Sequence, residues 1–288
     1  MITNLRDYDT SQPAMATVLS NDRITPPESD ADVRHLVLEA PESMLGYREG
    51  QSIGVLAPVT HDFGNYQHLR LYSIASPRHG EGGEDRFSLC VRRCFYIDDV
   101  SGERYPGQAS NYLCDAVPGD AIQITGPYGT AFTVPEDDHS NLLMIGVGTG
   151  IAPFRAFIRH TYEDRGGWKG KVRLFYGAKT GMELLYMNDF KKDLGLYYDD
   201  QSFKAFAAVS PRPHAGAPPA LDRLIADNVE EIWALVQDPK TYVYVAGLVD
   251  AARKFEKAMV DHAGSEQAWL EQRALLAANG RYAELLYE

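Results

Sequence analysis

Apolar and polar residues alternate along the first half of the chain in a way that predicts short β-strands. Apolar side chains occupy every second position over 87–91, and 121–125 repeats this two-residue period. A third run, 33–39, is short and rich in β-forming residues, and Gly, Pro and Asp turn signals separate the runs. Short strands with frequent turns predict an antiparallel β-barrel domain over residues 31–136.

From residue 137 to residue 288 the pattern changes, because short apolar runs now alternate with stretches of helical spacing. The apolar runs are 142–145, 172–176, 203–209 and 242–246. Helices are predicted around 182–193, 221–236, 250–262 and 266–278. This alternation predicts an α/β domain of the Rossmann-like type, with a parallel sheet covered by helices on both faces.

Composition narrows the class of protein. The 288 residues are enough for two domains of ~100–200 residues each. Residues 1–30 are polar, carry three prolines, and are predicted to form an N-terminal arm. With 28 Lys and Arg against 40 Asp and Glu, the net charge is −12, which argues against general nucleic-acid binding.

Location and metal content follow from what the sequence lacks. No stretch approaches the ~18–20 consecutive apolar residues of a membrane span, and the first residues have no signal-peptide core, so we expect a cytoplasmic protein. Cys90, Cys94 and Cys114 are one short of the four thiolates that commonly hold an iron–sulfur cluster. No compact set of His and Cys completes another site, and no metal is predicted.

A glycine-rich run follows the apolar stretch 142–145 and precedes a predicted helix. It contains Gly146, Gly148 and Gly150, with Thr149 between the last two. Glycines let backbone N–H groups approach a phosphate, and a helix N-terminus favours negative charge. The run departs from G-x-G-x-x-G, and a turn that needs glycine only for its backbone stays open as an alternative.

Two further motifs lie in the predicted barrel. Arg70-Leu71-Tyr72-Ser73 combines a cation that can bind a pyrophosphate, an aromatic ring and a hydroxyl donor. Later, Cys90-Val91-Arg92 precedes the run Gly107 to Ser110, where Ser110 is predicted to be the N-cap of a short helix.

Taken in chain order, these motifs resemble those of the plant-type ferredoxin–NADP reductase family over residues 35–288. The chain is also similar to the reductase module of bacterial benzoyl-CoA epoxidase systems. The resemblance is carried by R-x-Y-S, C-V-[KR]-R-x-x-Y, G-x-x-S-N-[FY]-L-C-D, G-P-x-G, G-x-G-T-G-x-A-P-F-R, L-L-Y, V-S, [CA]-G-L and a near-terminal Tyr.

The resemblance implies that the barrel binds FAD. Arg70 would hold the pyrophosphate, Tyr72 would stack on the isoalloxazine, and Ser73 would lie beside the flavin N5 atom. Leu71, in the same run, is also an implied FAD residue. The remaining implied FAD residues are Cys90, Val91, Arg92, Tyr96, Gly107, Gln108, Ala109 and Ser110.

The resemblance also implies that the second domain binds NADP or NAD. The implied residues are Gly148, Thr149, Gly150, Ala178, Lys179, Ser210, Arg212, Ala246, Gly247 and Leu248. Tyr287 would stack on the flavin and move aside before hydride transfer to FAD N5. Catalytic roles would fall to Ser73 and Tyr287.

Three departures from the family pattern change the expectation. Ala246 stands where the family has a cysteine, so chemistry should be slower or retuned. Leu285 stands where it has a glutamate, which leaves Glu284 and Glu288 as open candidates for the catalytic carboxylate. The 2′-phosphate site is altered, with Asp222 and Arg223 nearby, so the coenzyme preference leans only slightly to NADPH.

The implied function is electron transfer between NAD(P)H and a one-electron carrier such as ferredoxin or flavodoxin. The alternatives are the reductase component of an oxygenase and a non-catalytic subunit that docks a redox partner. A small acidic partner would need a local basic patch on this acidic chain. The candidates for that patch are Arg78, Arg92, Arg93, Arg155 and Arg159.

Overall fold

The computed structural model describes residues 5–42, 46–61, 64–129, 132–198, 202–209 and 220–287, apart from the side chains of Arg6 and residues 59–66. The chain divides into two units, Met1–Thr130 and Ala131–Glu288. The first unit contains the predicted antiparallel strands and the second contains the predicted parallel sheet.

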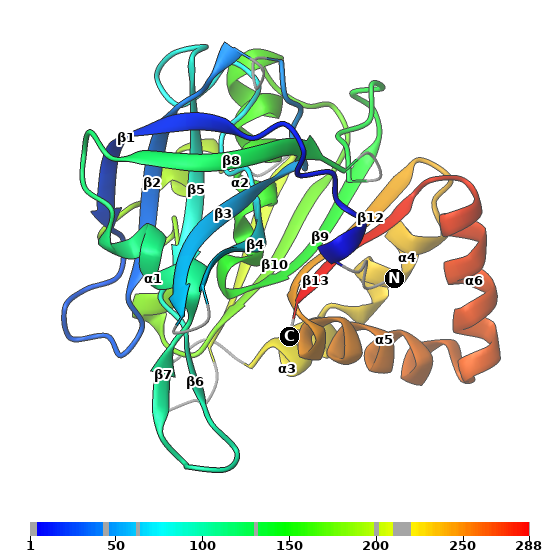
Figure 1. Ribbon diagram of the computed structural model, residues 1–288. Helices are drawn as coiled ribbons and strands as arrows, with labels where there is room; N and C mark the ends of the chain where they lie inside the picture. Colours follow the sequence, from blue (N-terminus) through cyan, green and yellow to red (C-terminus); the bar gives the residue numbers. More distant parts are fainter. Residues whose placement is uncertain are drawn as a thin grey trace. The chain divides into compact units, whose positions relative to one another are not determined.

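A six-stranded antiparallel sheet with strand order β4-β3-β8-β1-β2-β5 forms the first unit (Figure 1). Its strands are β1 (Ala14–Arg23), β2 (Val33–Glu39), β3 (Ser52–His61), β4 (Gly64–Ser73), β5 (Arg86–Arg92) and β8 (Ala121–Tyr128). The edge strands meet where Ile74 bridges Leu89 and the Ala75 amide donates to the Ser88 carbonyl at 2.8 Å. These contacts curl the sheet into the predicted barrel around an apolar core.

Strand β1 differs from the expectation for the N-terminal segment, because its residues lie inside the predicted arm. It pairs with β2 on one side and β8 on the other, and Ala16 and Val18 are buried in the barrel core. Only part of the strand faces the core, since Met15 and Leu19 are exposed, and the surrounding polar residues and prolines gave the segment the composition of an arm. The arm prediction is therefore wrong for Ala14–Arg23.

A short hairpin and one helix connect β5 to β8. The hairpin strands are β6 (Phe95–Ile97) and β7 (Arg104–Pro106), and the hairpin extends away from the sheet (Figure 1). Helix α1 (Gln108–Asp115) has Gly107 as its N-cap, so the prediction of Ser110 as the N-cap is wrong. Ser110 lies inside the first turn, where its buried hydroxyl accepts from the Cys94 amide at 3.1 Å and fastens the helix to the hairpin base.

A five-stranded parallel sheet with strand order β11-β10-β9-β12-β13 forms the second unit. Its strands are β9 (Asn141–Val147), β10 (Val172–Ala178), β11 (Phe203–Val209), β12 (Thr241–Leu248) and β13 (Tyr282–Tyr287). The strands β9, β10 and β12 are buried along nearly their whole length, which explains their continuous apolar sequences. The C-terminal residues form a strand paired with β12, an element that the sequence analysis did not predict.

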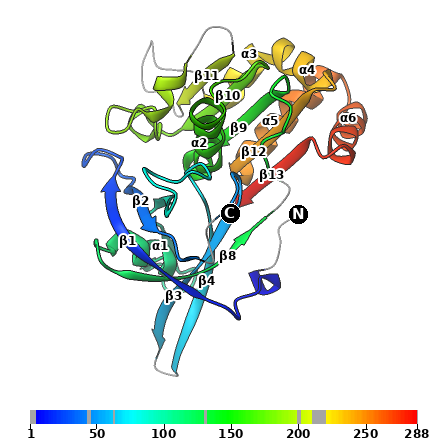
Figure 2. The same cartoon turned by 90° about the horizontal axis from the view of Figure 1, so that it is seen from above.

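Helices cover both faces of the parallel sheet (Figure 2). Helix α2 (Ile151–Arg159) packs on one face and continues into a π-helical turn, His160–Asp164. The other face carries α3 (Leu221–Asp227), α4 (Val229–Gln237), α5 (Val249–Ala263) and α6 (Glu266–Ala278), whose apolar residues share one core. Among the described helices, none has the length and apolar character needed to cross a membrane.

The predicted helix over 182–193 is wrong. Two 3-10 turns, Gly181–Glu183 and Asp193–Tyr197, flank an irregular stretch in which Tyr186 has a left-handed φ of 61°. The Leu184, Leu185 and Tyr186 side chains are buried, which produces the apolar spacing that suggested a helix. The spacing of apolar residues over 182–193 therefore comes from the burial of an irregular segment, and not from a helix.

Asn21 on β1 links the barrel to α1, because its Nδ2 donates to the carbonyls of Leu113, Cys114 and Ala116 at 3.1, 3.2 and 2.7 Å. We expect Asn21→Ala to lower the free energy of unfolding by about 1–2 kcal/mol, since the helix end loses its donor. Asn21→Asp should be worse, because a carboxylate would face three carbonyl oxygens. Urea unfolding of both variants checks this order, and equal stability of Asn21→Asp and wild type would contradict it.

Candidate functional site

The carboxyl ends of the parallel strands bring the predicted dinucleotide residues to one edge of the sheet. Gly148–Gly150 follow β9, Ala178 ends β10 and Lys179 follows it, Ala246–Leu248 end β12, and Tyr287 ends β13. Leu248 pairs with Tyr287 in the strand register. This edge is where parallel α/β sheets bind their ligands.

The glycines of this edge serve two different purposes. A Cβ on Gly150 would lie 2.3 Å from the Ala246 carbonyl oxygen, and a Cβ on Gly247 would lie 2.6 Å from that of Val147. These two glycines therefore allow the backbones that leave β9 and β12 to pack directly on each other. Gly148 is different, because it has a left-handed φ of 53° and its Cβ position faces open space. The open side of the turn at Gly148 leaves room for a ligand.

Two tyrosine hydroxyls hold the turn Gly148–Gly150 from different strands. The Tyr287 hydroxyl and Thr149 Oγ1 are 2.7 Å apart and share a hydrogen bond. The Tyr176 hydroxyl, on β10, donates to the Gly148 carbonyl at 2.8 Å. Sequence analysis missed Tyr176, although a tyrosine within an apolar strand is a signal, since its buried hydroxyl needs a partner.

Strand alternation separates Glu284 from Tyr287. Glu284 lies on the face of β13 that packs toward α6, where it accepts from Arg273 at 3.2 Å and from the Tyr282 hydroxyl at 2.7 Å. Burial raises the pKa of Tyr282, which keeps that phenol protonated and donating. The prediction of a catalytic Glu284 disagrees with this placement. Leu285 alternates to the same face as Tyr287, and Glu288 lies outside the described residues.

The predicted flavin residues of the first unit lie at the ends of β4 and β5 and at the start of α1. Arg70 has an exposed side chain, and one of its N–H groups donates to the Leu69 carbonyl at 3.0 Å. Tyr72 packs against the barrel core, and burial raises the pKa of its phenol, so the hydroxyl stays protonated. Ser73 ends β4 as a half-buried residue.

The start of α1 offers backbone donors for an anion. No side chain caps this helix N-terminus, so the amides of its first turn are available to a phosphate. The Gly107 amide donates to the Cys94 carbonyl at 2.9 Å, which places Gly107–Ser110 beside the chain that leaves β5. These features, together with Arg70, fit the pyrophosphate of a dinucleotide such as FAD.

The remaining predicted flavin residues differ in exposure. Val91 is fully buried in the barrel core, so it can contribute to a ligand site only through its backbone. Cys90 is also buried and Arg92 is half-buried. Tyr96 is exposed on the hairpin and stacks on Tyr105 with ring centroids 5.6 Å apart, which leaves an aromatic surface for a flat ring.

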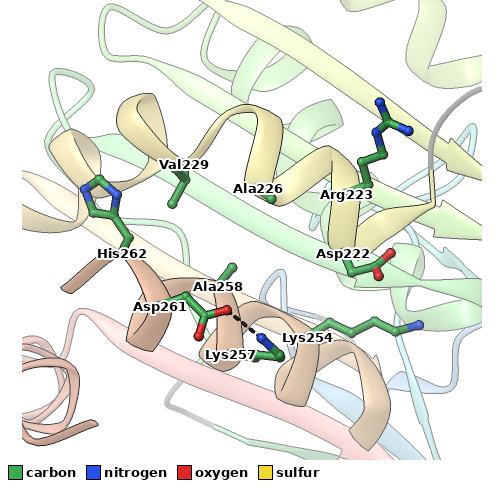
Figure 3. A pocket seen from close by; sticks show the side chains of 9 residues that line it. All are labelled: Asp222, Arg223, Ala226, Val229, Lys254, Lys257, Ala258, Asp261 and His262. Carbon is green, nitrogen blue, oxygen red and sulfur yellow. Dashed lines mark hydrogen bonds and ion pairs between the residues drawn. The ribbon is translucent and has the colours of Figure 1, made fainter. Parts of the chain in front are cut away.

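A pocket of about 550 Å³ lies between α3 and α5 (Figure 3). It is lined by Asp222, Arg223, Ala226, Val229, Lys254, Lys257, Ala258, Asp261 and His262. Its cations have carboxylate partners on their own helices: Lys254 with Asp250 at 2.8 Å, Lys257 with Asp261 at 2.5 Å and Arg223 with Asp227 at 3.7 Å. Each of these cations is thus matched by a carboxylate, and Asp222 adds a further acidic group to the lining. Ser210 and Arg212, predicted for the coenzyme, lie outside the described residues.

Arginines predicted for a basic docking patch are used inside the fold. Arg93 donates to Asp32 at 2.9 Å and Asn111 at 3.0 Å and pairs with Asp115 at 2.8 Å. Arg155 is only 1% exposed and donates to Asp193 at 2.7 Å. The prediction that these two arginines form an exposed patch is wrong. Arg78 and Arg159 also have carboxylate partners, Glu49 and Glu163.

Comparison with protein families assigns both units. Residues 22–132 match the oxidoreductase FAD-binding domain, and residues 144–257 match the oxidoreductase NAD-binding domain. The barrel with its pyrophosphate-binding features and the parallel sheet with its glycine turn correspond to these two domains. The chain is therefore an oxidoreductase that uses FAD and a nicotinamide coenzyme.

Curated relatives narrow this class further. The cyanelle ferredoxin–NADP reductase of Cyanophora paradoxa is 36% identical over 87% of this chain and 70% of its own length. The Spirulina enzyme is 35% identical over 89% of both chains, and leaf isozyme 1 of Arabidopsis thaliana is 35% identical over 97% of this chain and 79% of its own. The chain belongs to the ferredoxin–NADP reductase family.

Solved structures agree on the fold. A variant of ferredoxin–NADP+ reductase from Plasmodium falciparum, in complex with 2′P-AMP, matches with a TM-score of 0.73 and 20% identity. The match covers 97% of this chain and 98% of that chain. The family resemblance and the two-domain fold predicted from the sequence are confirmed.

We expect Gly150→Ala to destabilise the second unit by about 1–3 kcal/mol, because its Cβ would meet the Ala246 backbone, which cannot rotate away. Coenzyme affinity should fall while flavin content, which depends on the first unit, is retained. Gly195→Ala is the matched control, since its added Cβ meets nothing within 4 Å. Guanidinium unfolding and NADP+ titration check this, and equal behaviour of the two variants would contradict it.

Proposed function

We propose that this chain transfers electrons between NADPH and a ferredoxin, with FAD as the intermediate carrier. One observation carries the proposal: the side chain of Tyr287 lies on the glycine turn, hydrogen-bonded to Thr149, at the edge of the sheet where a nicotinamide coenzyme would bind. The names of the relatives support the same reaction and the same partner.

Residues of the first unit would hold the FAD. Arg70 would bind the pyrophosphate together with the first-turn amides of α1, and Tyr72 and Ser73 would contact the isoalloxazine. When bound, FAD exchanges two electrons with a nicotinamide and single electrons with an iron–sulfur protein. The protonated Tyr72 phenol would be a neutral hydrogen-bond donor there.

Tyr287 would act as a gate on the coenzyme site. Its side chain is 41% exposed, and displacing it breaks the hydrogen bond to Thr149. A hydrogen bond of this kind is worth about 0.5–1.5 kcal/mol, which a binding nicotinamide can replace. The Tyr287 side chain would therefore cover the site until a nicotinamide displaces it.

Ala246 would retune the nicotinamide site. Its side chain is buried and its carbonyl packs against Gly150, so the residue shapes the turn and has no thiol to contact the ring. The coenzyme would be positioned mainly by the turn and by Tyr287. We infer slower chemistry from this arrangement than a flanking thiol would give, with the same coenzyme and the same direction of binding.

The partner would be a small acidic ferredoxin, with flavodoxin as a second carrier. The chain carries a net charge of −12, so its overall charge repels an acidic partner. At physiological salt, dissolved ions screen this repulsion at separations beyond ~8 Å. With Arg93 and Arg155 inside the fold and Arg70 assigned to the pyrophosphate, steering would depend on the remaining candidates, Arg78, Arg92 and Arg159.

Steady-state turnover tests the proposed function. The purified protein should be yellow and should oxidise NADPH with ferricyanide, and it should then reduce a ferredoxin, with NADH as the weaker coenzyme. The ferredoxin rate should fall as salt rises, because association with an acidic carrier is steered by charge. A colourless protein, or one that reduces ferricyanide but no ferredoxin or flavodoxin, would sink the proposal.

We expect Tyr287→Ser to tighten NADP+ binding by about tenfold and to lower kcat, because the coenzyme would occupy the site without displacing a ring. Discrimination between NADPH and NADH should weaken for the same reason. Tyr287→Phe is the matched variant, since it keeps the ring and removes only the bond to Thr149, and its effect should be smaller. Spectral titration with NADP+ measures both. An unchanged affinity in Tyr287→Ser would mean that the ring is only part of the packing.

A further inference from the structure

Tyr176 makes a contact that its position in the core does not require. It lies on β10, its side chain is 0% exposed, and its hydroxyl donates to the Gly148 carbonyl at 2.8 Å. The same hydroxyl accepts from the Leu185 amide at 3.3 Å, which also donates to the Glu183 carbonyl at 2.9 Å. A phenylalanine would fill the same space, so the hydroxyl contributes hydrogen bonds to these backbone groups and not the filling of the core.

The Gly148 carbonyl determines how the glycine turn presents its amides. A trans peptide is planar, so the Gly148 carbonyl and the Thr149 N–H point in opposite directions. Tyr176 draws that carbonyl toward the core, and the Ile151 amide donates to the same oxygen. The Thr149 N–H, on the opposite side of the same peptide, is thereby directed away from Tyr176. The neighbouring Gly148 has no atom within 4 Å of its Cβ position, so the turn has open space on that side.

We propose that Tyr176 is a positioning residue for the coenzyme pyrophosphate, which it serves by orienting the Gly148–Thr149 peptide. The inference rests on the proposed function, since it assumes that the turn receives a dinucleotide. Backbone N–H groups at a helix start bind phosphate oxygens well only when they are already aimed at them. Tyr176 does not touch the coenzyme and acts through Gly148.

The Tyr176 hydroxyl is itself held from the other side. The segment that carries Leu185 is fastened to α2 by Arg155, which donates to Asp193 at 2.7 Å and lies 4.8 Å from the ring centre of Tyr186. Tyr186 keeps its left-handed φ of 61° within this contact. The Leu185 amide is thus a fixed donor, which leaves the Tyr176 proton directed at Gly148.

Tyr176→Phe tests the proposal, with Tyr244→Phe as the matched control. Tyr244 is a buried tyrosine on β12 of the same sheet. Its hydroxyl also donates to a backbone carbonyl, that of Thr133, at 2.6 Å. We expect Tyr176→Phe to raise KM about 3- to 10-fold, the value of one lost hydrogen bond, with kcat changed less than about twofold. The factor should be the same for NADPH and NADH, because both carry the pyrophosphate. Tyr244→Phe should leave both KM values unchanged.

Three results would overturn the proposal: no change of KM in Tyr176→Phe, an equal change in Tyr244→Phe, or a change for NADPH alone. Full flavin content and an unaltered melting curve establish that the variants are folded. If Tyr176→Phe does not accumulate, Tyr176→Met fills the space without a hydroxyl and should give the same increase. Direct NADP+ titration separates the proposed function from the role of Tyr176. If wild type binds NADP+ but does not reduce ferredoxin, the proposed function is contradicted, and the role of Tyr176 is still tested by comparing the NADP+ affinity of wild type and Tyr176→Phe.

Discussion

Direct backbone packing between the ends of β9 and β12 is the constraint on which the carboxyl edge of the parallel sheet depends. Gly150 and Gly247 bring the two chains so close that a methyl group on either would overlap a carbonyl oxygen. This contact brings Gly148–Thr149 and Ala246–Leu248 to the same place at the carboxyl edge of the sheet. Within the turn, Gly150 faces β12, and Gly148 faces open space.

Two tyrosines hold this turn in different ways, and the difference follows from burial. Tyr176 is enclosed in the sheet, so its hydrogen bond to Gly148 is permanent and directional. Tyr287 ends the last strand and is partly exposed, so its bond to Thr149 can exchange with water or with a ligand. The Tyr176 hydroxyl is therefore held inside the sheet, while the Tyr287 hydroxyl is partly accessible.

Several arginines of this protein form ion pairs that hold segments of the fold together. Arg93 joins α1 to the loop before β2, Arg155 joins α2 to the segment after β10, and Arg273 joins α6 to Glu284 on β13. Arg155 is the buried case, and removing Asp193 would leave its charge inside the fold, so Arg155 is poorly suited to binding a mobile partner. Sequence proximity to a cofactor motif is not evidence of exposure.

The sequence by itself determined the two-domain class, part of the barrel sheet, four of the five strands of the parallel sheet and the family, because those depend on local periodicity and on motif order. It also located the glycine turn and the terminal tyrosine. Only the tertiary structure decided that β1 is central to the barrel, that Glu284 faces away from Tyr287, and that Arg155 is buried, since each depends on which neighbour covers a face. Tyr176 belongs to the same group: its hydroxyl finds Gly148 across the parallel register of β9 and β10, a contact between distant residues that no local pattern encodes.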